Sequence, residues 1–189
     1  DSDLVSGVGN AGAVVVEAPG QFFHAKLGDS FKQIDIPLVE GVRYKKATVE
    51  FDMYVDRFPG GSFAGVTSLR RTDRTMYYGL IVRGGRSKAI LAMGRDDDIV
   101  SGNSGPWKER TNYRLVFEYD LVTARLTFKT IRNGTLVETL AGPINHHDLS
   151  KNGKIVRVDF GMSGVADGAY FPPIGWRYSN LKITFEPQE

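Results

Sequence analysis

The sequence predicts an all-β fold, a two-sheet antiparallel β-sandwich of the jelly-roll type. About a dozen short runs alternate between apolar and polar side chains, which is the period-2 pattern of half-buried strands. Polar connections rich in turn residues separate these runs, in a chain with 22 glycines. No segment has the period of a long helix, and no unit repeats at a fixed length. Hydrophobic residues make up 41% of the 189 residues, enough for one sizeable core, so a sandwich or barrel is expected.

Composition also bounds the organisation of the chain. Residues 1–12 are small and glycine-rich, and we expect them to be a flexible, loosely held N-terminal segment. No later break in composition divides residues 13–189, which we expect to form a single β-sandwich domain. No apolar run approaches the roughly 20 residues of a membrane span, so we expect no membrane span.

Charge and cysteine content exclude several function classes. The chain has no cysteine, which rules out disulfides and thiolate metal sites. The net charge is +2 and the basic residues are scattered, so we expect no nucleic acid partner, although an acidic polymer is compatible with this balance. Phosphate-loop, nucleophile-elbow and zinc-type motifs are missing, which argues against nucleotide-dependent and serine-hydrolase chemistry.

Seven strands are predicted in the first half of the chain, at residues 13–17, 21–25, 31–37, 47–59, 62–70, 76–83 and 88–93. Pro19 and Gly20 predict a turn between the first two, and the Gly, Asp and Ser of 28–30 separate the next pair. Gly84 and Gly85 predict the turn before the last.

Five further strands are predicted at residues 112–119, 124–132, 136–140, 155–162 and 176–185. Asn133 and Gly134 both accept positive φ and predict a two-residue hairpin turn. The glycine-rich stretch 101–106 predicts a loop, and residues 146–150 are the one place where we expect a short helical turn. Trp176 is expected to pack in the core beside the last strand.

The strand at 47–59 sorts into two unlike faces. One face carries the apolar residues Val49, Phe51, Met53 and Val55, and the other carries Glu50, Asp52, Tyr54 and Asp56. Neighbours on the polar face are about 6.5–7 Å apart, a spacing that suits a ligand the size of a sugar ring. Two interpretations stay open: the face holds a cation or a sugar, or its carboxylates are balanced by neighbouring arginines.

Other residues are candidates for the same site. Alternation in 76–83 allows Tyr77 and Arg83 to join the polar face, and Arg70 and Lys88 are basic residues on adjoining predicted strands. Trp107 follows a glycine-rich loop, is flanked by Pro106, Lys108 and Glu109, and is our candidate for stacking on a sugar.

Three consecutive carboxylates in a predicted loop, Asp96, Asp97 and Asp98, are candidate calcium ligands, because calcium takes hard oxygen ligands. They lack the spacing of an EF-hand loop, and a solvated acidic turn explains them as well. We expect no cofactor to be required, with a structural calcium as the one candidate.

The order of strands, the hairpin sequence WKERTNYRLVFEYD and the ending GWRYSNLKITF resemble the concanavalin A-like superfamily of lectins, glucanases and polysaccharide lyases. The resemblance covers most of the chain at the level of architecture. It implies two stacked antiparallel sheets, a concave face that binds glycans and, often, a structural calcium.

The resemblance includes two enzyme branches. Family 16 laminarinase-type hydrolases carry a strand motif E-x-D-x-x-E or E-x-D-x-E, of which Glu50 and Asp52 match the first half, while Tyr54 or Val55 stands where the second glutamate belongs. Asp56 lies one or two residues too late, and adjacent carboxylates meet only the inverting separation of roughly 6.5–9.5 Å.

The second branch is the jelly-roll lyases that cleave uronate polymers. These need a group that neutralises the uronate carboxylate and a residue that exchanges protons. Tyr54, Tyr77 and Arg83 supply those residue types as candidate catalytic groups, with Arg70 and Lys88 as binding groups, but no ordered lyase motif is present.

The sequence therefore predicts a secreted or cell-surface glycan-binding module whose concave face includes Asp52, Tyr54, Tyr77 and Arg83. Its partner is a polysaccharide or other glycan, which can be acidic. A polysaccharide lyase or glycoside hydrolase on the same face is the alternative, the lyase being favoured if the chain is an enzyme. A structural or adhesion domain without a sugar site is the third class.

Overall fold

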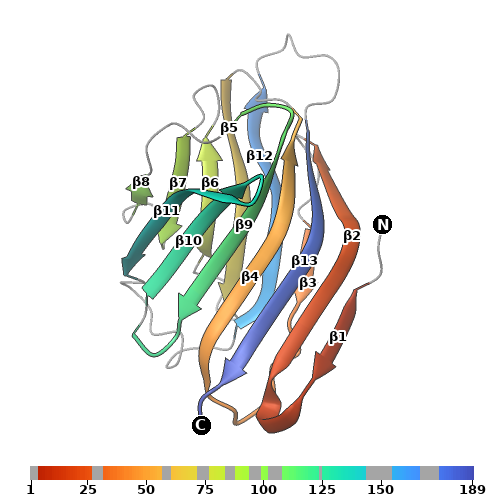
Figure 1. The fold of residues 1–189 in the computed structure, drawn as a ribbon, viewed down its shortest axis with the longest axis vertical. Coiled ribbons are helices and arrows are strands. Elements are labelled where there is room, and N and C mark those ends of the chain that lie inside the picture. Colours follow the sequence, from red (N-terminus) through yellow and green to blue (C-terminus); the bar gives the residue numbers. More distant parts are fainter. Residues whose placement is uncertain are drawn as a thin grey trace.

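The computed structural model describes residues 4–26, 32–56, 61–71, 77–83, 88–93, 99–101, 108–123, 125–143, 155–166 and 175–189. Two antiparallel sheets stack face to face, as Figure 1 shows. The seven-stranded sheet has the order β1 (Val5–Val8), β2 (Val14–Lys26), β13 (Gly175–Pro187), β4 (Tyr44–Val55), β9 (Thr111–Asp120), β10 (Arg125–Arg132) and β11 (Thr135–Pro143). The six-stranded sheet has the order β3 (Lys32–Asp35), β12 (Ile155–Ala166), β5 (Gly61–Arg71), β6 (Tyr77–Arg83), β7 (Lys88–Met93) and β8 (Ile99–Ser101).

The predicted all-β sandwich is confirmed, and the reason is visible in β4. Val49, Phe51, Met53 and Val55 are each at most 1% exposed, while the residues between them are partly exposed. The ring of Phe51 meets that of Phe160, on β12 of the other sheet, edge to face at 5.1 Å. The apolar face of β4 therefore builds the core between the two sheets, as its alternation predicts.

The last strand also contributes to this core. Trp176 is 1% exposed, as expected for a residue that packs in the core beside the last strand, and Tyr178 is fully buried. The ring of Tyr178 lies 5.4 Å from that of Phe160 and 5.7 Å from that of Phe51. Burial raises the pKa of the Tyr178 hydroxyl, because the charged phenolate would lose its hydration.

The turn predicted at Pro19 and Gly20 is wrong, because β2 runs without a break from Val14 to Lys26. The two residues instead lie at an irregularity in the pairing of β2 with β13. Gly20 has φ +75° and Asn180, opposite it on β13, has φ +52°, both in the left-handed region. Paired irregularities of this kind keep two strands together while shifting their register.

Turn chemistry is confirmed at the β10–β11 hairpin, where Asn133 and Gly134 have φ values of 49° and 72°. Two strands were not predicted: β8, and β1 within the segment expected to be loosely held. A short 3-10 turn at Asn10–Gly12 follows β1, and the Tyr44 hydroxyl donates to the Gly12 carbonyl at 2.8 Å. The helical turn predicted at 146–150 lies outside the described residues.

Among the described segments, we find no helix with the length and apolar character needed to cross a membrane.

Candidate functional site

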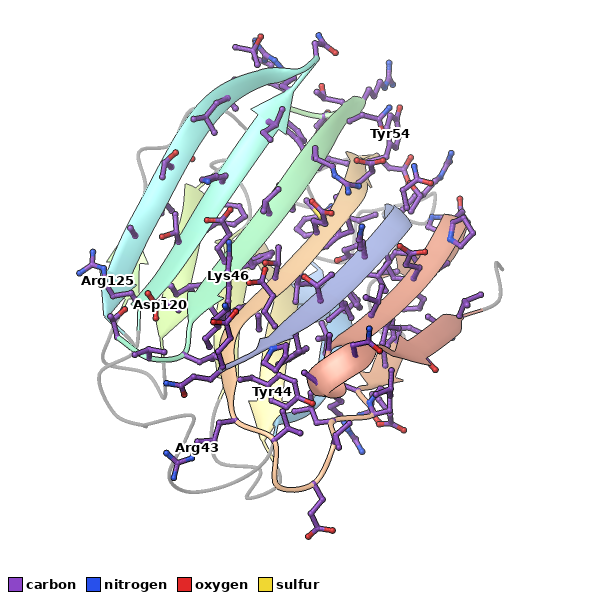
Figure 2. The ribbon with its side chains drawn as sticks, turned by 60° about the horizontal axis from the view of Figure 1, so that its bottom comes forward. Arg43, Tyr44, Lys46, Tyr54, Asp120 and Arg125 are labelled. Carbon is purple, nitrogen blue, oxygen red and sulfur yellow. The ribbon has the colours of Figure 1, made fainter. Side chains whose placement is uncertain are left out.

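The polar face of β4 points away from the second sheet. Since the apolar residues of this strand are buried, the alternating partners Glu50, Asp52 and Tyr54 lie on the outward face of the seven-stranded sheet. Asp56 follows directly after the end of the strand. Figure 2 shows Tyr54 at one end of this sheet and Lys46 towards the other end.

Arg114 on β9 lies directly across from Asp52. Its Nη1 donates to Asp52 Oδ1 at 3.2 Å, and its Nη2 lies 3.6 Å from Glu50 Oε2. All three side chains are about one-third exposed. The structure therefore pairs two carboxylates of the acidic row with one neighbouring arginine.

Asn180 connects this ion pair to the irregularity in β13. Its Nδ2 donates to Asp52 Oδ2 at 2.7 Å, and its carbonyl oxygen accepts from Arg114 Nη1 at 3.0 Å. Its Oδ1 accepts from the Gly20 N–H at 3.0 Å. The left-handed conformation of Asn180 thus lets one residue hold the side chains of two neighbouring strands in place.

A second cluster lies at the end of β4. Asp56 Oδ1 is 3.4 Å from Arg177 Nη2, and Asp56 Oδ2 is 3.5 Å from His24 Nε2. The guanidinium of Arg177 lies over the Tyr54 ring, with its carbon 5.5 Å from the ring centroid. This is the geometry of a cation–π contact, so one face of Tyr54 is covered by a cation.

A polar hollow of about 350 Å³ lies beside the Asp52–Arg114 pair. It is lined by Asp52, Asn112, Tyr113, Arg114, Ile131, Asn133, Gly134, Ser179 and Asn180. Within the described part of the chain, the side chains of Asn112, Asn133 and Ser179 make no hydrogen bond to protein. Their amide and hydroxyl groups are therefore available to a ligand.

Tyr113 also borders this hollow, but its side chain belongs to the buried face of β9, opposite to Arg114. Its side chain is 1% exposed, and burial raises the pKa of its hydroxyl group. The backbone N–H of Lys108 donates to that hydroxyl. The side chain of Tyr113 is therefore part of the core of the sandwich.

The structure does not bring all predicted site residues together. Tyr77 and Arg83 lie on β6, Arg70 lies on β5 and Lys88 on β7, all in the six-stranded sheet. The expectation that these strands share a face with β4 is wrong, because the chain passes to the other sheet between β4 and β5. Trp107, Asp96, Asp97 and Asp98 lie outside the described residues, and their roles stay predictions. Within the described ranges, no three His, Asp or Glu residues are grouped closely enough to hold a metal ion.

Of the residues that line the hollow, only Asp52 was predicted as a site residue, and the polar side chains that were missed are those of Asn112, Arg114, Asn133, Ser179 and Asn180. Arg114 lies on the polar side of a correctly predicted strand, but its partner depends on strand pairing. The sequence does carry a signal at Asn180. The apolar, buried positions of β13 are even-numbered before it, at Trp176 and Tyr178, and odd-numbered after it, at Leu181 and Ile183. A shift of one position in a period-2 pattern indicates a bulge.

Comparison with solved structures identifies the fold. The CBM2 module of an evolved Dit protein of Lactobacillus casei BL23 phage J-1 is similar over 100% of this chain and 82% of its own, with a TM-score of 0.58 and 9% identity. Lectin UEA-II, complexed with galactose, is similar over 97% of this chain and 86% of its own, with a TM-score of 0.55 and 11% identity. Winged bean acidic lectin, complexed with methyl-α-D-galactose, is similar over 98% and 87%, with a TM-score of 0.52 and 10% identity.

No protein-family model matches the chain, and no curated protein sequence matches it significantly. The structural likeness shows that the chain has the two-sheet jelly-roll fold of these lectins, as its sequence predicts. At these identities the likeness defines the fold, and the ligand has to be argued from the hollow.

Proposed function

We propose that this chain is a carbohydrate-binding module whose glycan lies in the hollow between β4, β9 and β13. The observation that carries the proposal is the set of unengaged amide and hydroxyl groups around an ordered Asp–Arg–Asn network. Sugar hydroxyls both donate and accept hydrogen bonds, so they pair with amides, carboxylates and guanidinium groups placed in fixed positions. The volume of about 350 Å³ lies at the small end of the range for ligand sites.

Binding, rather than hydrolysis, is the function that this network favours. Glycoside hydrolysis needs one carboxyl group that donates a proton and a second one that acts as nucleophile or base. Glu50 and Asp52 instead share the guanidinium of Arg114, so both carboxylates are engaged in the same ion-pair network. We therefore propose that these two carboxylates position Arg114 and the glycan.

The guanidinium of Arg114 also bears on whether the site binds a metal ion. A cation bound to the row of carboxylates would need the space between Glu50 and Asp52, where Arg114 already supplies positive charge. We propose that the hollow binds its glycan without a metal ion, and that the module acts in a secreted or cell-surface protein. Dialysis against EDTA is expected to leave glycan binding unchanged.

The test is affinity electrophoresis and calorimetry against a panel of polysaccharides, with Asn112→Ala as the site variant. We expect Asn112→Ala to weaken binding about tenfold, the cost of roughly 1.4 kcal/mol for one lost hydrogen bond to a sugar. Thr48→Ala is the matched control, because Thr48 lies on the same face of β4, about 13 Å from Asp52. Binding to no polysaccharide, or equal losses in both variants, would rule the proposal out. Release of products from any polymer would instead favour an enzyme.

A further inference from the structure

Two rows of side chains cross the outward face of the seven-stranded sheet at the hollow. The first row consists of Ser179, Asp52 and Arg114, which are paired across β13, β4 and β9 and line the hollow. The strand register places a second row next to it, at His24, Arg177, Tyr54 and Asn112 on β2, β13, β4 and β9. Tyr54 marks this end of the sheet in Figure 2. Successive positions on one face of a strand are about 6.5–7 Å apart, so a sugar chain held in the hollow reaches the second row with its next unit.

Arg177 is the arginine of the second row. Its side chain is 51% exposed, and its Nη2 lies 3.4 Å from Asp56 Oδ1. In the described part of the chain, Asp56 is its only carboxylate within ion-pair distance. The guanidinium also lies over the Tyr54 ring, 5.5 Å from the centroid. Because a guanidinium carries five N–H donors in a rigid, planar fork, these two neighbours fix its position and leave donors for a ligand.

Arg110 brings another cation to this end of the sheet. Its backbone N–H donates to the carbonyl of Val55, the residue before Asp56, and its side chain is exposed. Its φ of 54° is in the left-handed region, which is uncommon for residues other than glycine, asparagine and aspartate. Backbone outliers of this kind cluster at ligand sites, where a side chain is needed in spite of the conformational cost.

The remaining charges at this end add to the positive field. Lys108 is exposed and precedes Arg110 by two residues. Arg132 stands between two residues that line the hollow, and its charge partly opposes the effect of burial on the pKa of the Tyr113 hydroxyl. Among the described residues at this end, four cations therefore stand against two carboxylates, without counting His24: Lys108, Arg110, Arg132 and Arg177 against Asp56 and Glu109.

We infer that the glycan is acidic, and that Arg177 binds a carboxylate or sulfate group on the sugar unit next to the hollow. A guanidinium pairs with the oxygens of either group through parallel N–H···O bonds. In the first row, Glu50 and Asp52 outnumber Arg114, which suits the neutral hydroxyls of a sugar and directs the acidic group to the second row. The inference rests on the proposed function, because it names the class of glycan for the same site.

The test compares polymers that differ only in charge. Alginate and polygalacturonate are each paired with their carboxyl-reduced counterpart, and a sulfated galactan with its desulfated form, by calorimetry at about 150 mM salt. We expect the acidic member of at least one pair to bind about threefold to fivefold more tightly, the effect of one half-exposed ion pair. The two kinds of pair distinguish carboxylate from sulfate recognition. Equal binding, or tighter binding of the uncharged member, in every pair would overturn the inference.

Arg177→Gln and a matched control locate the effect. We expect Arg177→Gln to weaken only the acidic member, so that the ratio within the pair falls below about twofold. Lys182→Gln removes an equal charge from the same face of β13, where Lys182 is 46% exposed. It lies about 16 Å along the strand from Arg177, about twice the screening length of roughly 8 Å, and is expected to keep the ratio unchanged. Equal effects of the two variants would overturn the inference, because the net charge of the chain would then attract the polymer.

Asn112→Ala separates failure of this inference from failure of the proposed function. We expect Asn112→Ala to weaken both members of a pair, because a hydrogen bond to a sugar hydroxyl does not depend on the acidic group. Loss of both members in Asn112→Ala with no dependence on Arg177 would overturn the inference alone. Binding to no polymer, or binding that Asn112→Ala leaves unchanged, would refute the proposed function and the inference with it.

Discussion

Replacement of Asn180 tests the network that shapes the hollow. Asn180→Gly keeps a backbone that accepts φ +52° but removes the hydrogen bonds to Asp52 and from Gly20. Each such bond contributes about 0.5–1.5 kcal/mol net. We therefore expect Asn180→Gly to lower the free energy of unfolding by about 1–3 kcal/mol, including a small entropic cost of glycine.

Asn180→Ala loses the same bonds and adds a Cβ at positive φ that no local hydrogen bond compensates. A left-handed alanine costs about 1–2 kcal/mol, so Asn180→Ala is expected to be about 1 kcal/mol less stable than Asn180→Gly. In Asn180→Asp, the aspartate also accepts positive φ, and its side-chain oxygen still accepts from the Gly20 N–H. The change places a second carboxylate beside Asp52. Its destabilisation is expected at pH 7 and is relieved near pH 3, where carboxyl groups in general are protonated.

Urea unfolding followed by tryptophan fluorescence measures all three variants, since Trp176 is buried. Unchanged m-values would show that the variants unfold from the same compact state. Two results would refute the reasoning: wild-type stability in Asn180→Gly, or Asn180→Ala no less stable than Asn180→Gly. The first would mean that the side-chain bonds contribute nothing, and the second that the backbone relaxes out of the left-handed region.

Three further predictions concern stability. Phe51→Ala is expected to cost about 3–5 kcal/mol in urea unfolding, because Phe51 is fully buried between the sheets, whereas Phe51→Leu should cost about 1–2 kcal/mol. Burial raises the pKa of Glu138, and its Oε2 has no hydrogen-bond partner. The native state therefore binds more protons than the unfolded state, so the free energy of unfolding falls as the pH rises above the unfolded pKa of this group. Glu138→Gln should flatten that fall in unfolding curves measured from pH 4 to 8. The pKa of Asp120 is lowered, chiefly by the hydrogen bond from the Thr123 N–H. The Asp120 carboxylate therefore stabilises the fold above the unfolded pKa, and this stabilisation is lost as the pH falls. Asp120→Ala should make the loss of stability in acid less steep, and an unchanged dependence on pH in this range would contradict the assignment.

Local features of this fold could be predicted from the sequence because their causes are local. The apolar alternation of Val49, Phe51 and Met53 follows from the period of a strand, and it correctly predicted which face of β4 is buried. The hairpin at Asn133 and Gly134 follows from the tolerance of both residues for positive φ. The turn prediction failed at Gly20, because glycine's tolerance for positive φ is needed in a bulge as well as in a turn.

The site itself depended on tertiary structure. That Arg114, rather than Arg83, meets Asp52 is decided by the register of β4 with β9 and by the passage of the chain to the other sheet before β6. Strand pairing is a long-range choice that no local period encodes, since every polar face along the chain alternates in the same way. The presence of a polar face could therefore be predicted from the sequence, whereas its partners and the hollow beside Asn180 arise only when distant strands are placed side by side.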